Sequence, residues 1–266
     1  MKTPRYEIQY QYGQELFIKP FFDVHWGATA CDEKAFLQDL KETDENTYLL
    51  FGGDLFDSIL PSDRRYRKST DKTITEAIID ECLDEMVEVL KPYRHRILGI
   101  GLGNHEDVLI SRCGTNVIKR LCNLLDVQSM GYSGLYRLSL RKGKHGGGGR
   151  KIIIRYHHGW GGGSRTQGAD LTKYSKDVAY WEADLFLYGH VHKNQVDKIP
   201  RLGLVGDKLV AKPKIICICG SYLKTYMKGD IPTYSEKKGY PPVMIESPCI
   251  KIKPTRTYLE IKAYTD

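Results

Sequence analysis

Six short apolar runs divide the chain between residues 15 and 219. Each has the length and the β-branched or aromatic content of a buried strand, and turn-forming residues bound it. We therefore expect strands over residues 15–22, 47–51, 96–100, 151–156, 184–188 and 214–219.

Segments with helical spacing of apolar residues lie between several of these strands. The clearest covers residues 70–90, where apolar side chains recur on one helix face. Further helices are predicted over residues 32–41, 106–125 and 171–181. Strands that alternate with helices predict an α/β architecture.

The chain changes character from residue 194 onward, where strand and turn signals dominate. We expect this part to form antiparallel strands at a sheet edge or in a second sheet. A glycine-rich segment, 143–149, is typical of a hairpin tip between strands near 136–141 and 151–156. No repeat or long linker interrupts the sequence, so we expect a single domain over residues 1–266.

Composition is that of a soluble globular protein, with 41% hydrophobic and 27% charged residues. The N-terminus has no apolar signal segment, and no apolar run approaches the ~18–20 residues of a membrane span. The net charge of +7 is compatible with an anionic substrate and does not by itself establish nucleic-acid binding. We expect a cytoplasmic protein without membrane association.

The seven cysteines are odd in number and contain no Cys-x-x-Cys pair. This pattern favours a reducing compartment over a disulfide framework. Cys217 and Cys219 lie two apart in a predicted strand and therefore on one face, where apolar packing explains them better than metal ligation does.

Residues suited to chemistry gather at the ends of five predicted strands, in glycine-flanked turns. In an open α/β sheet the loops at the carboxyl ends of the strands converge on one edge. Six of the eight histidines fall in these five places, which a random scatter would not produce. The places are Asp23-x-His25, Asp54-x-x-Asp57, Asn104-His105-Glu106, His157-His158 and His190-x-His192.

Carboxylate, amide and imidazole ligands without a thiolate suit Mn, Fe, Zn or Co rather than a structural zinc site built on cysteine. One carboxylate that bridges two such ions holds them ~3.5–4 Å apart, the spacing of a two-metal phosphoryl-transfer centre. The side chains at the strand ends are thus the right types for a dinuclear hydrolytic site.

The ordered set Asp-x-His, Gly-Asp-x-x-Asp, Gly-Asn-His-Glu, His-Gly and Gly-His-x-His resembles the calcineurin-like metallophosphoesterase superfamily. The resemblance covers residues 21–192, and the glycine-rich segment after His158 is similar to that of small phage and bacterial members. It implies a four-layer α/β/β/α sandwich with two mixed β-sheets, which the strand-rich part 193–266 fits.

The resemblance also implies two divalent metal ions, with Mn as the expected metal and Fe, Zn, Co or Ni as alternatives. The implied ligands are Asp23, His25 and His192 for one ion and Asn104, His158 and His190 for the other, with Asp54 bridging both. Some relatives place one residue between ligand and turn, which would select His157 instead. The glycine directly after His158 favours His158.

Hydrolysis of a phosphate ester by hydroxide generated between the two metal ions is the implied reaction. His105 would contact the phosphate and protonate the leaving oxygen as general acid, and Asn104 and Arg165 would join it in binding substrate. Glu106 would orient a neighbouring group, and Asp57 would do the same or cap a turn. Because histidine ligands must be neutral, activity should fall as the pH drops through roughly 6.

Phosphodiesters of a nucleotide or nucleic acid are the favoured substrates, ahead of phosphomonoesters. Trp26, Trp160, Arg64, Arg65 and Arg165 are the residues that could stack on a base or pair with phosphate, although pocket-wall packing explains the tryptophans equally well. The alternative function is a catalytically inactive metal-binding or nucleic-acid-binding scaffold of the same fold.

Overall fold

The computed structural model describes residues 1–11, 13–58, 78–143, 149–230, 232–255 and 258–265. Within them, two six-stranded sheets run in the orders β1-β6-β7-β8-β10-β9 and β12-β11-β2-β3-β4-β5. We call these the β8 sheet and the β2 sheet. The strands of the β8 sheet are β1 (Arg5–Tyr10), β6 (Ser133–Lys142), β7 (Arg150–His157), β8 (Leu185–Tyr188), β9 (Asn194–Val205) and β10 (Lys208–Cys219).

The strands of the β2 sheet are β2 (Leu16–Phe21), β3 (Thr47–Phe51), β4 (Ile97–Gly101), β5 (Ser129–Gly131), β11 (Cys249–Pro254) and β12 (Leu259–Tyr264). Both sheets mix parallel and antiparallel pairs. The α-helices are α1 (Glu33–Lys41), α2 (Ile78–Leu90), α3 (Asn104–Cys113), α4 (Val117–Leu125), α5 (Ala169–Ser175) and α6 (Tyr234–Lys238), with 3-10 helices η1 (Lys91–Arg96) and η2 (Lys176–Ala179).

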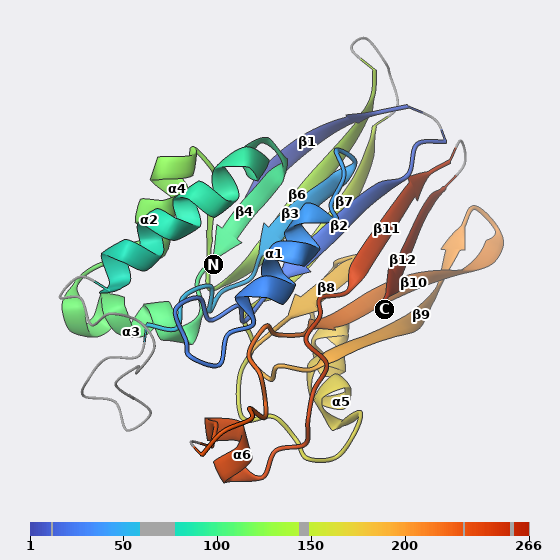
Figure 1. The fold of residues 1–266 in the computed structure, drawn as a ribbon. Helices are drawn as coiled ribbons and strands as arrows, with labels where there is room; N and C mark the ends of the chain where they lie inside the picture. The colour runs from blue at the N-terminus through green and yellow to red at the C-terminus, as the bar shows by residue number, and fades with distance from the viewer. Residues whose placement is uncertain (12, 59–77, 144–148, 231, 256–257, 266) are drawn as a thin grey trace.

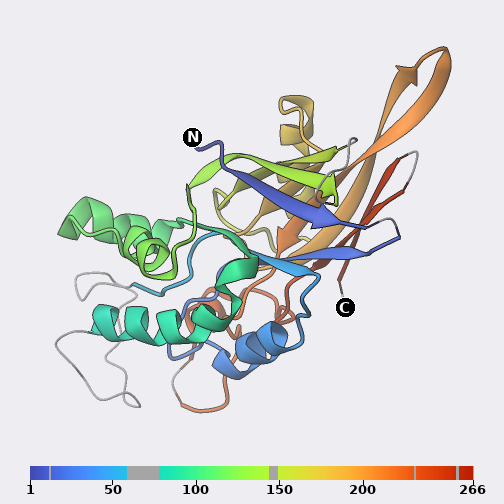
Figure 2. The same cartoon turned by 90° about the horizontal axis from the view of Figure 1, so that it is seen from above.

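The sheets pack face to face and each is covered by helices on its outer side (Figures 1 and 2). Side chains from both sheets, among them Leu50, Leu138 and Cys217, fill the space between them. α1, α2 and α4 pack on the outer face of the β2 sheet, and α5 with η2 packs on that of the β8 sheet. The expected four-layer α/β/β/α sandwich with two mixed sheets is confirmed.

The part after residue 194 has the predicted character. β9 pairs antiparallel with β10 at one edge of the β8 sheet, and β12 and β11 extend the β2 sheet by antiparallel pairing. Cys217 and Cys219 are fully buried between the sheets, as their shared face predicted. None of the helices in the described ranges is long and apolar enough to cross a membrane.

The predicted helix over 106–125 is two helices. Gly114 ends α3 in the left-handed conformation, with φ 68°, and its N–H donates to the carbonyls of Leu109 and Ile110. A single glycine costs a helix only ~1 kcal/mol, so the helical pattern alone does not place the break. The first part of the predicted helix 70–90, the basic segment with Arg64 and Arg65, and the hairpin tip 144–148 lie outside the described residues.

Replacing Gly114 tests this break. A Cβ at residue 114 meets no atom within 4 Å, so the cost of Gly114→Ala is that of the left-handed backbone alone. We expect a loss of about 1 kcal/mol in the free energy of unfolding, measured by urea denaturation. Gly162→Ala, also in open space but without a positive φ, is the control and should be nearly neutral. A Gly114→Ala protein as stable as the wild type would contradict the cap.

Candidate metal centre

The carboxyl ends of β2, β3, β4, β7 and β8 meet at one edge of the sandwich, because β2, β3 and β4 are parallel to one another in one sheet and β7 and β8 are parallel in the other. Backbone hydrogen bonds join the loops that follow them: the N–H of Asp23 donates to the carbonyl of Gly53, and that of Gly189 to His158. The structure thereby brings together all seven residues that the sequence suggested as metal ligands.

The first group of ligand atoms belongs to Asp23, His25 and His192. The Nε2 atoms of the two histidines are 3.3 Å apart. Oδ1 of Asp23 is 3.5 Å from Nε2 of His192 and 4.0 Å from Nε2 of His25. Two ligands on one ion, each at ~2.1 Å, lie roughly 3–4 Å apart. The three atoms are therefore spaced as ligands of a common ion.

The second group comprises Asn104, His158 and His190. Nε2 of His158 is 2.9 Å from Oδ1 of Asn104. A nitrogen of His190 and one of His158 lie, together with a carboxylate oxygen of Asp54, within 4.8 Å of one another. These donors too can surround a single ion.

Asp54 lies between the two groups. Its Oδ2 is 3.3 Å from Nε2 of His158 and 3.9 Å from Nε2 of His25, one histidine of each group. Its other oxygen, Oδ1, accepts the backbone N–H of His105 at the start of α3, at 2.9 Å. That bond fixes the carboxylate so that Oδ2 faces both groups.

Asp23 provides the clearest sign that the site is suited to a cation. Its Oδ2 accepts the backbone N–H of His190 at 2.7 Å, but its Oδ1 is buried without a hydrogen-bond partner among the described residues. A buried carboxylate oxygen without a partner costs several kcal/mol unless a cation satisfies it. This oxygen faces the nitrogens of His25, His158 and His192 at 3.5–4.0 Å, so the donor set fits a metal ion.

Neighbouring groups orient the histidines. Nδ1 of His158 lies 3.3 Å from the carbonyl of Gly52, and donation to that oxygen leaves Nε2 as the ligand atom. Nδ1 of His25 lies 3.2 Å from Oδ1 of Asp57, with the same effect. Of the two roles expected for Asp57, orienting a neighbouring group or capping a turn, this contact supports the first.

The carboxylates also set the charge of the site. Burial alone would lower the pKa of both His25 and His158. The hydrogen bond to Asp57 and the charge of Asp54 outweigh burial and raise the pKa of His25 to about 8, and Asp54 raises that of His158 to about 9. The site attracts positive charge, and a divalent ion competes there with protons.

Glu106 stabilises the loops that carry the ligands through hydrogen bonds to their backbone. Its fully buried carboxylate accepts the backbone N–H groups of Gly103 at 2.9 Å, Asp54 at 3.1 Å and Phe56 at 2.9 Å. The carboxylate of Glu106 therefore caps the N-terminus of α3 through Gly103. The same carboxylate also holds the loop that carries Asp54 and Phe56. Burial, followed by the charge of Asp54, raises the pKa of Glu106 to about 7.

The loops of the site adopt an unusual backbone conformation, with positive φ at residues other than glycine. Of the non-glycine residues with positive φ, five lie in the site: Asp23, His25, Asp54, His190 and His192, at 49–71°. Left-handed conformations of such residues cost of order 1–3 kcal/mol each and persist where surrounding structure imposes them. They concentrate where the ligand atoms must turn inward.

His157 and His158 have different surroundings, because strand β7 ends at His157. His158 is fully buried and faces the ligand atoms described above. Nδ1 of His157 instead accepts the N–H of Gly159, and its ring packs edge-on against Tyr132 and Trp160. The geometry favours the choice of His158 over His157.

The proposed substrate-binding residues differ in position. His105 is buried, with Nε2 4.0 Å from Oδ2 of Asp54. Arg165 lies on an exposed loop and donates to the carbonyl of Lys238, so its role stays a prediction. Trp26 is 5% exposed and packs in the core, whereas Trp160 is 37% exposed.

Sequence reasoning missed Tyr132 and Ser221. The ring of Tyr132 packs against both His157 and His158, and Ser221 donates its hydroxyl to the carbonyl of Asp23 at 2.8 Å. Neither residue lies in a recognisable pattern, and only the tertiary structure brings them to the site.

No family model and no curated protein matches the chain. Among solved structures it is similar to a conserved uncharacterized protein of Streptococcus pneumoniae, a predicted phosphoesterase, with 15% identity over 95% of this chain and 90% of that one and a TM-score of 0.33. Vps29 of Entamoeba histolytica in complex with Zn²⁺ is 12% identical over 94% of this chain and 98% of that one, with a TM-score of 0.35. GAP50, the anchor in the inner membrane complex of Plasmodium, is 11% identical over 94% of this chain and 84% of that one, with a TM-score of 0.45.

Likenesses of this size do not bear on activity, substrate or partners. The chain's own architecture, two mixed sheets between helices, is the one implied by its resemblance to the calcineurin-like metallophosphoesterases. The five sets of residues that carry the resemblance lie at one edge of that sandwich.

Separate alanine substitutions of the adjacent histidines test the second group. We expect His158→Ala to lose one metal equivalent per chain, because Nε2 of His158 faces Asn104 and Asp54. His157→Ala is the matched control and should keep both equivalents. Metal content after loading with Mn(II) and desalting, read by elemental analysis, gives the answer. Loss of metal from the His157 variant only would reverse the choice.

Proposed function

We propose that the chain is a dinuclear metallophosphoesterase that hydrolyses phosphate-ester bonds. The observation that carries the proposal is the position of Asp54, whose Oδ2 lies within 4 Å of a histidine nitrogen in each of two ligand groups. One carboxylate between two sets of oxygen and nitrogen donors is the arrangement that would hold two divalent ions ~3.5–4 Å apart.

In this proposal Asp23, His25 and His192 hold one ion, and Asn104, His158 and His190 hold the other, with Asp54 shared. The unpaired Oδ1 of Asp23 and the inward-facing Nε2 atoms support it. The oxygen and imidazole donors of both groups, without a cysteine, suit Mn, Fe, Zn, Co or Ni, and we propose Mn as the resident metal.

When bound, two divalent ions would supply a nucleophile from water at neutral pH and would stabilise the charge that builds on the phosphoryl oxygens. His105 takes the role of general acid. Its Nδ1 contacts the backbone carbonyl of Asp57, which holds the ring with Nε2 toward the ligand groups. Burial lowers the pKa of His105, which makes its protonated ring a stronger acid toward the leaving oxygen and a less populated form at neutral pH.

The substrate class we propose is the phosphodiester of a nucleotide or nucleic acid, ahead of phosphomonoesters. The excess of seven positive charges favours a polyanion, and the half-open ring of Trp160 beside His157 offers a surface for a base. Turnover of bis-p-nitrophenyl phosphate, p-nitrophenyl phosphate, cyclic nucleotides and DNA with Mn(II) tests the class. A protein that binds two ions but turns over none of these would be the scaffold of the alternative.

Asp54→Ala tests the shared carboxylate. Because Asp54 faces both groups, we expect metal content to fall by more than one equivalent per chain. Asp107→Ala is the control. Asp107 is an exposed aspartate in the first turn of α3, and this variant should retain both ions. Two tightly bound ions in the Asp54 variant would sink the bridging role.

His105→Ala tests the general acid. We expect both metals to remain and turnover to fall by roughly 10²–10⁴-fold. The loss should be smaller for p-nitrophenyl esters, whose leaving group needs little protonation. His95→Ala, which changes an exposed histidine bound to Glu45, is the control and should leave turnover intact. Equal losses on activated and unactivated esters would argue for phosphate binding without acid catalysis.

A further inference from the structure

The hairpin of β9 and β10 extends well beyond the rest of its sheet (Figures 1 and 2). β10 pairs with β8 only from Ile215 to Ile218, whereas it pairs with β9 along its whole length. The outer part of the hairpin, residues 200–213, is therefore a two-stranded ribbon, which we call the arm. A two-stranded ribbon is at best marginally stable in water unless its apolar face packs against something.

One face of the arm is entirely apolar. Residues opposite each other in an antiparallel pair lie on the same face, and alternate pairs along the ribbon share that face. The pairs on this face are Leu204–Leu209, Leu202–Ala211 and Pro200–Pro213. The three leucines are 73%, 69% and 69% exposed (Leu202, Leu204, Leu209).

The opposite face of the arm carries basic residues. The pair Arg201–Lys212 lies there, beside the pair Gly203–Val210. Both charged residues are exposed. The arm thus has one side that avoids water and one that is suited to it.

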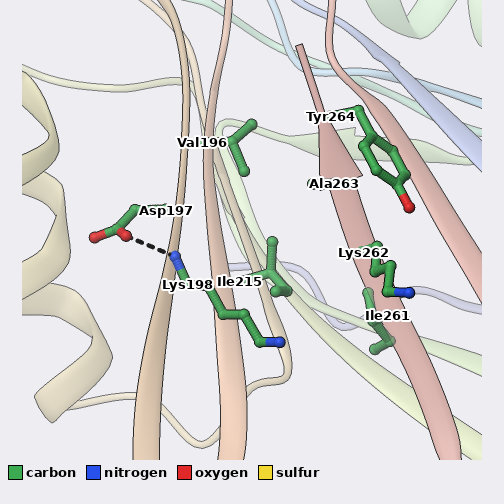
Figure 3. A pocket seen from close by; sticks show the side chains of 8 residues that line it. All are labelled: Val196, Asp197, Lys198, Ile215, Ile261, Lys262, Ala263 and Tyr264. Atoms are coloured by element: carbon green, nitrogen blue, oxygen red, sulfur yellow. Dashed lines mark hydrogen bonds between the residues drawn. The ribbon is translucent and has the colours of Figure 1, made fainter.

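The apolar face continues the face that packs between the two sheets. Val196 and Ile215 share it by the two-residue repeat, and both pack on the core between the sheets. Where the arm leaves the sandwich, they border a cleft of about 240 Å³ against Ile261 and Ala263 of β12 (Figure 3). Beyond this cleft, none of the described segments covers the apolar face. The arm is therefore one layer of a sandwich for which no described segment provides the second layer.

We propose that the apolar face of the arm binds the same face of a second copy of this chain, so that two arms pack face to face. The three leucines with Pro200, Ala211 and Pro213 present roughly 500–600 Å² per copy, and a pair of arms removes about 1,000–1,200 Å² from water, the lower end of specific interfaces. The basic faces then point away from each other.

Charge complementarity favours an antiparallel pair of arms. Lys198 lies at the base of the arm on the apolar side, and Asp207 lies in the turn at its tip. When the arms run in opposite directions, the tip of one meets the base of the other, which brings opposite charges together. Parallel packing would bring like charges together.

The dimer leaves the metal centre open. β10 runs parallel to β8, and the carboxyl ends of both strands are at the edge that carries His190. The tip of the arm lies at the other end of β10. Association and turnover are therefore separate properties, and the failure of one leaves the other untouched.

Sedimentation velocity from ~1 to ~100 µM tests the proposal. The full chain should show a concentration-dependent species of twice its 30.4 kDa mass. Leu204→Asp with Leu209→Asp should raise the dissociation constant at least about 100-fold, because each copy would bury two charges against the apolar face of the other. The control, Val210→Asp with Lys212→Asp, adds the same two aspartates to the opposite face and should dimerise like the wild type.

Thermal melts and turnover of bis-p-nitrophenyl phosphate check that each variant is folded. A wild type that is monomeric throughout the range would overturn the proposal, as would equal dissociation of both double variants. Flotation with phosphatidylcholine vesicles, with and without phosphatidylserine, covers the lipid alternative. Vesicle binding that depends on Leu204 and Leu209, without a dimer in solution, would assign the face to a lipid surface and also overturn it.

Discussion

Burial of the carboxylates of Asp23 and Asp54 at a single point is the constraint on which the rest of the site depends. Two buried negative charges are unfavourable unless positive or hydrogen-bonding groups surround them. The burial of Asp23, reinforced by the charge of Asp54, raises the pKa of Asp23 to about 7. Histidine nitrogens, the N–H groups of His105 and His190, and divalent cations are the partners that this pair of aspartates demands.

The surrounding fold holds the two carboxylates in place at a cost in backbone strain. Five left-handed residues would each prefer another conformation. Small residues make the arrangement sterically possible: a Cβ on Gly103 would lie 2.1 Å from Oδ1 of Asp54, and one on Gly189 would lie 2.5 Å from Oδ2 of Asp23. A metal ion that binds the folded state and not the unfolded state would raise the free energy of unfolding. The increase is ~2.7 kcal/mol at a metal concentration 100 times the dissociation constant.

Much of this arrangement could be predicted from the sequence because it is local. The strand over 47–51 has the predicted bounds. The candidate ligands directly follow predicted strands, so the direction of those strands places the ligands at one edge of the sandwich. Contacts between distant segments could not be predicted. The three backbone groups that Glu106 binds come from two loops, and the packing of Tyr132 on His158 depends on how two strands meet. β10 begins at Lys208 rather than 214, since its outer half has no sheet around it to give the sequence a buried-strand pattern.

The central claim is that Asp54 joins two metal ions into one centre. Electron paramagnetic resonance of the Mn(II)-loaded protein tests it most directly, because two Mn(II) ions ~3.5–4 Å apart with a shared carboxylate couple magnetically. We predict the signal of an exchange-coupled pair in the wild type at two equivalents of Mn(II). Signals of isolated, uncoupled Mn(II) at that loading would contradict the account.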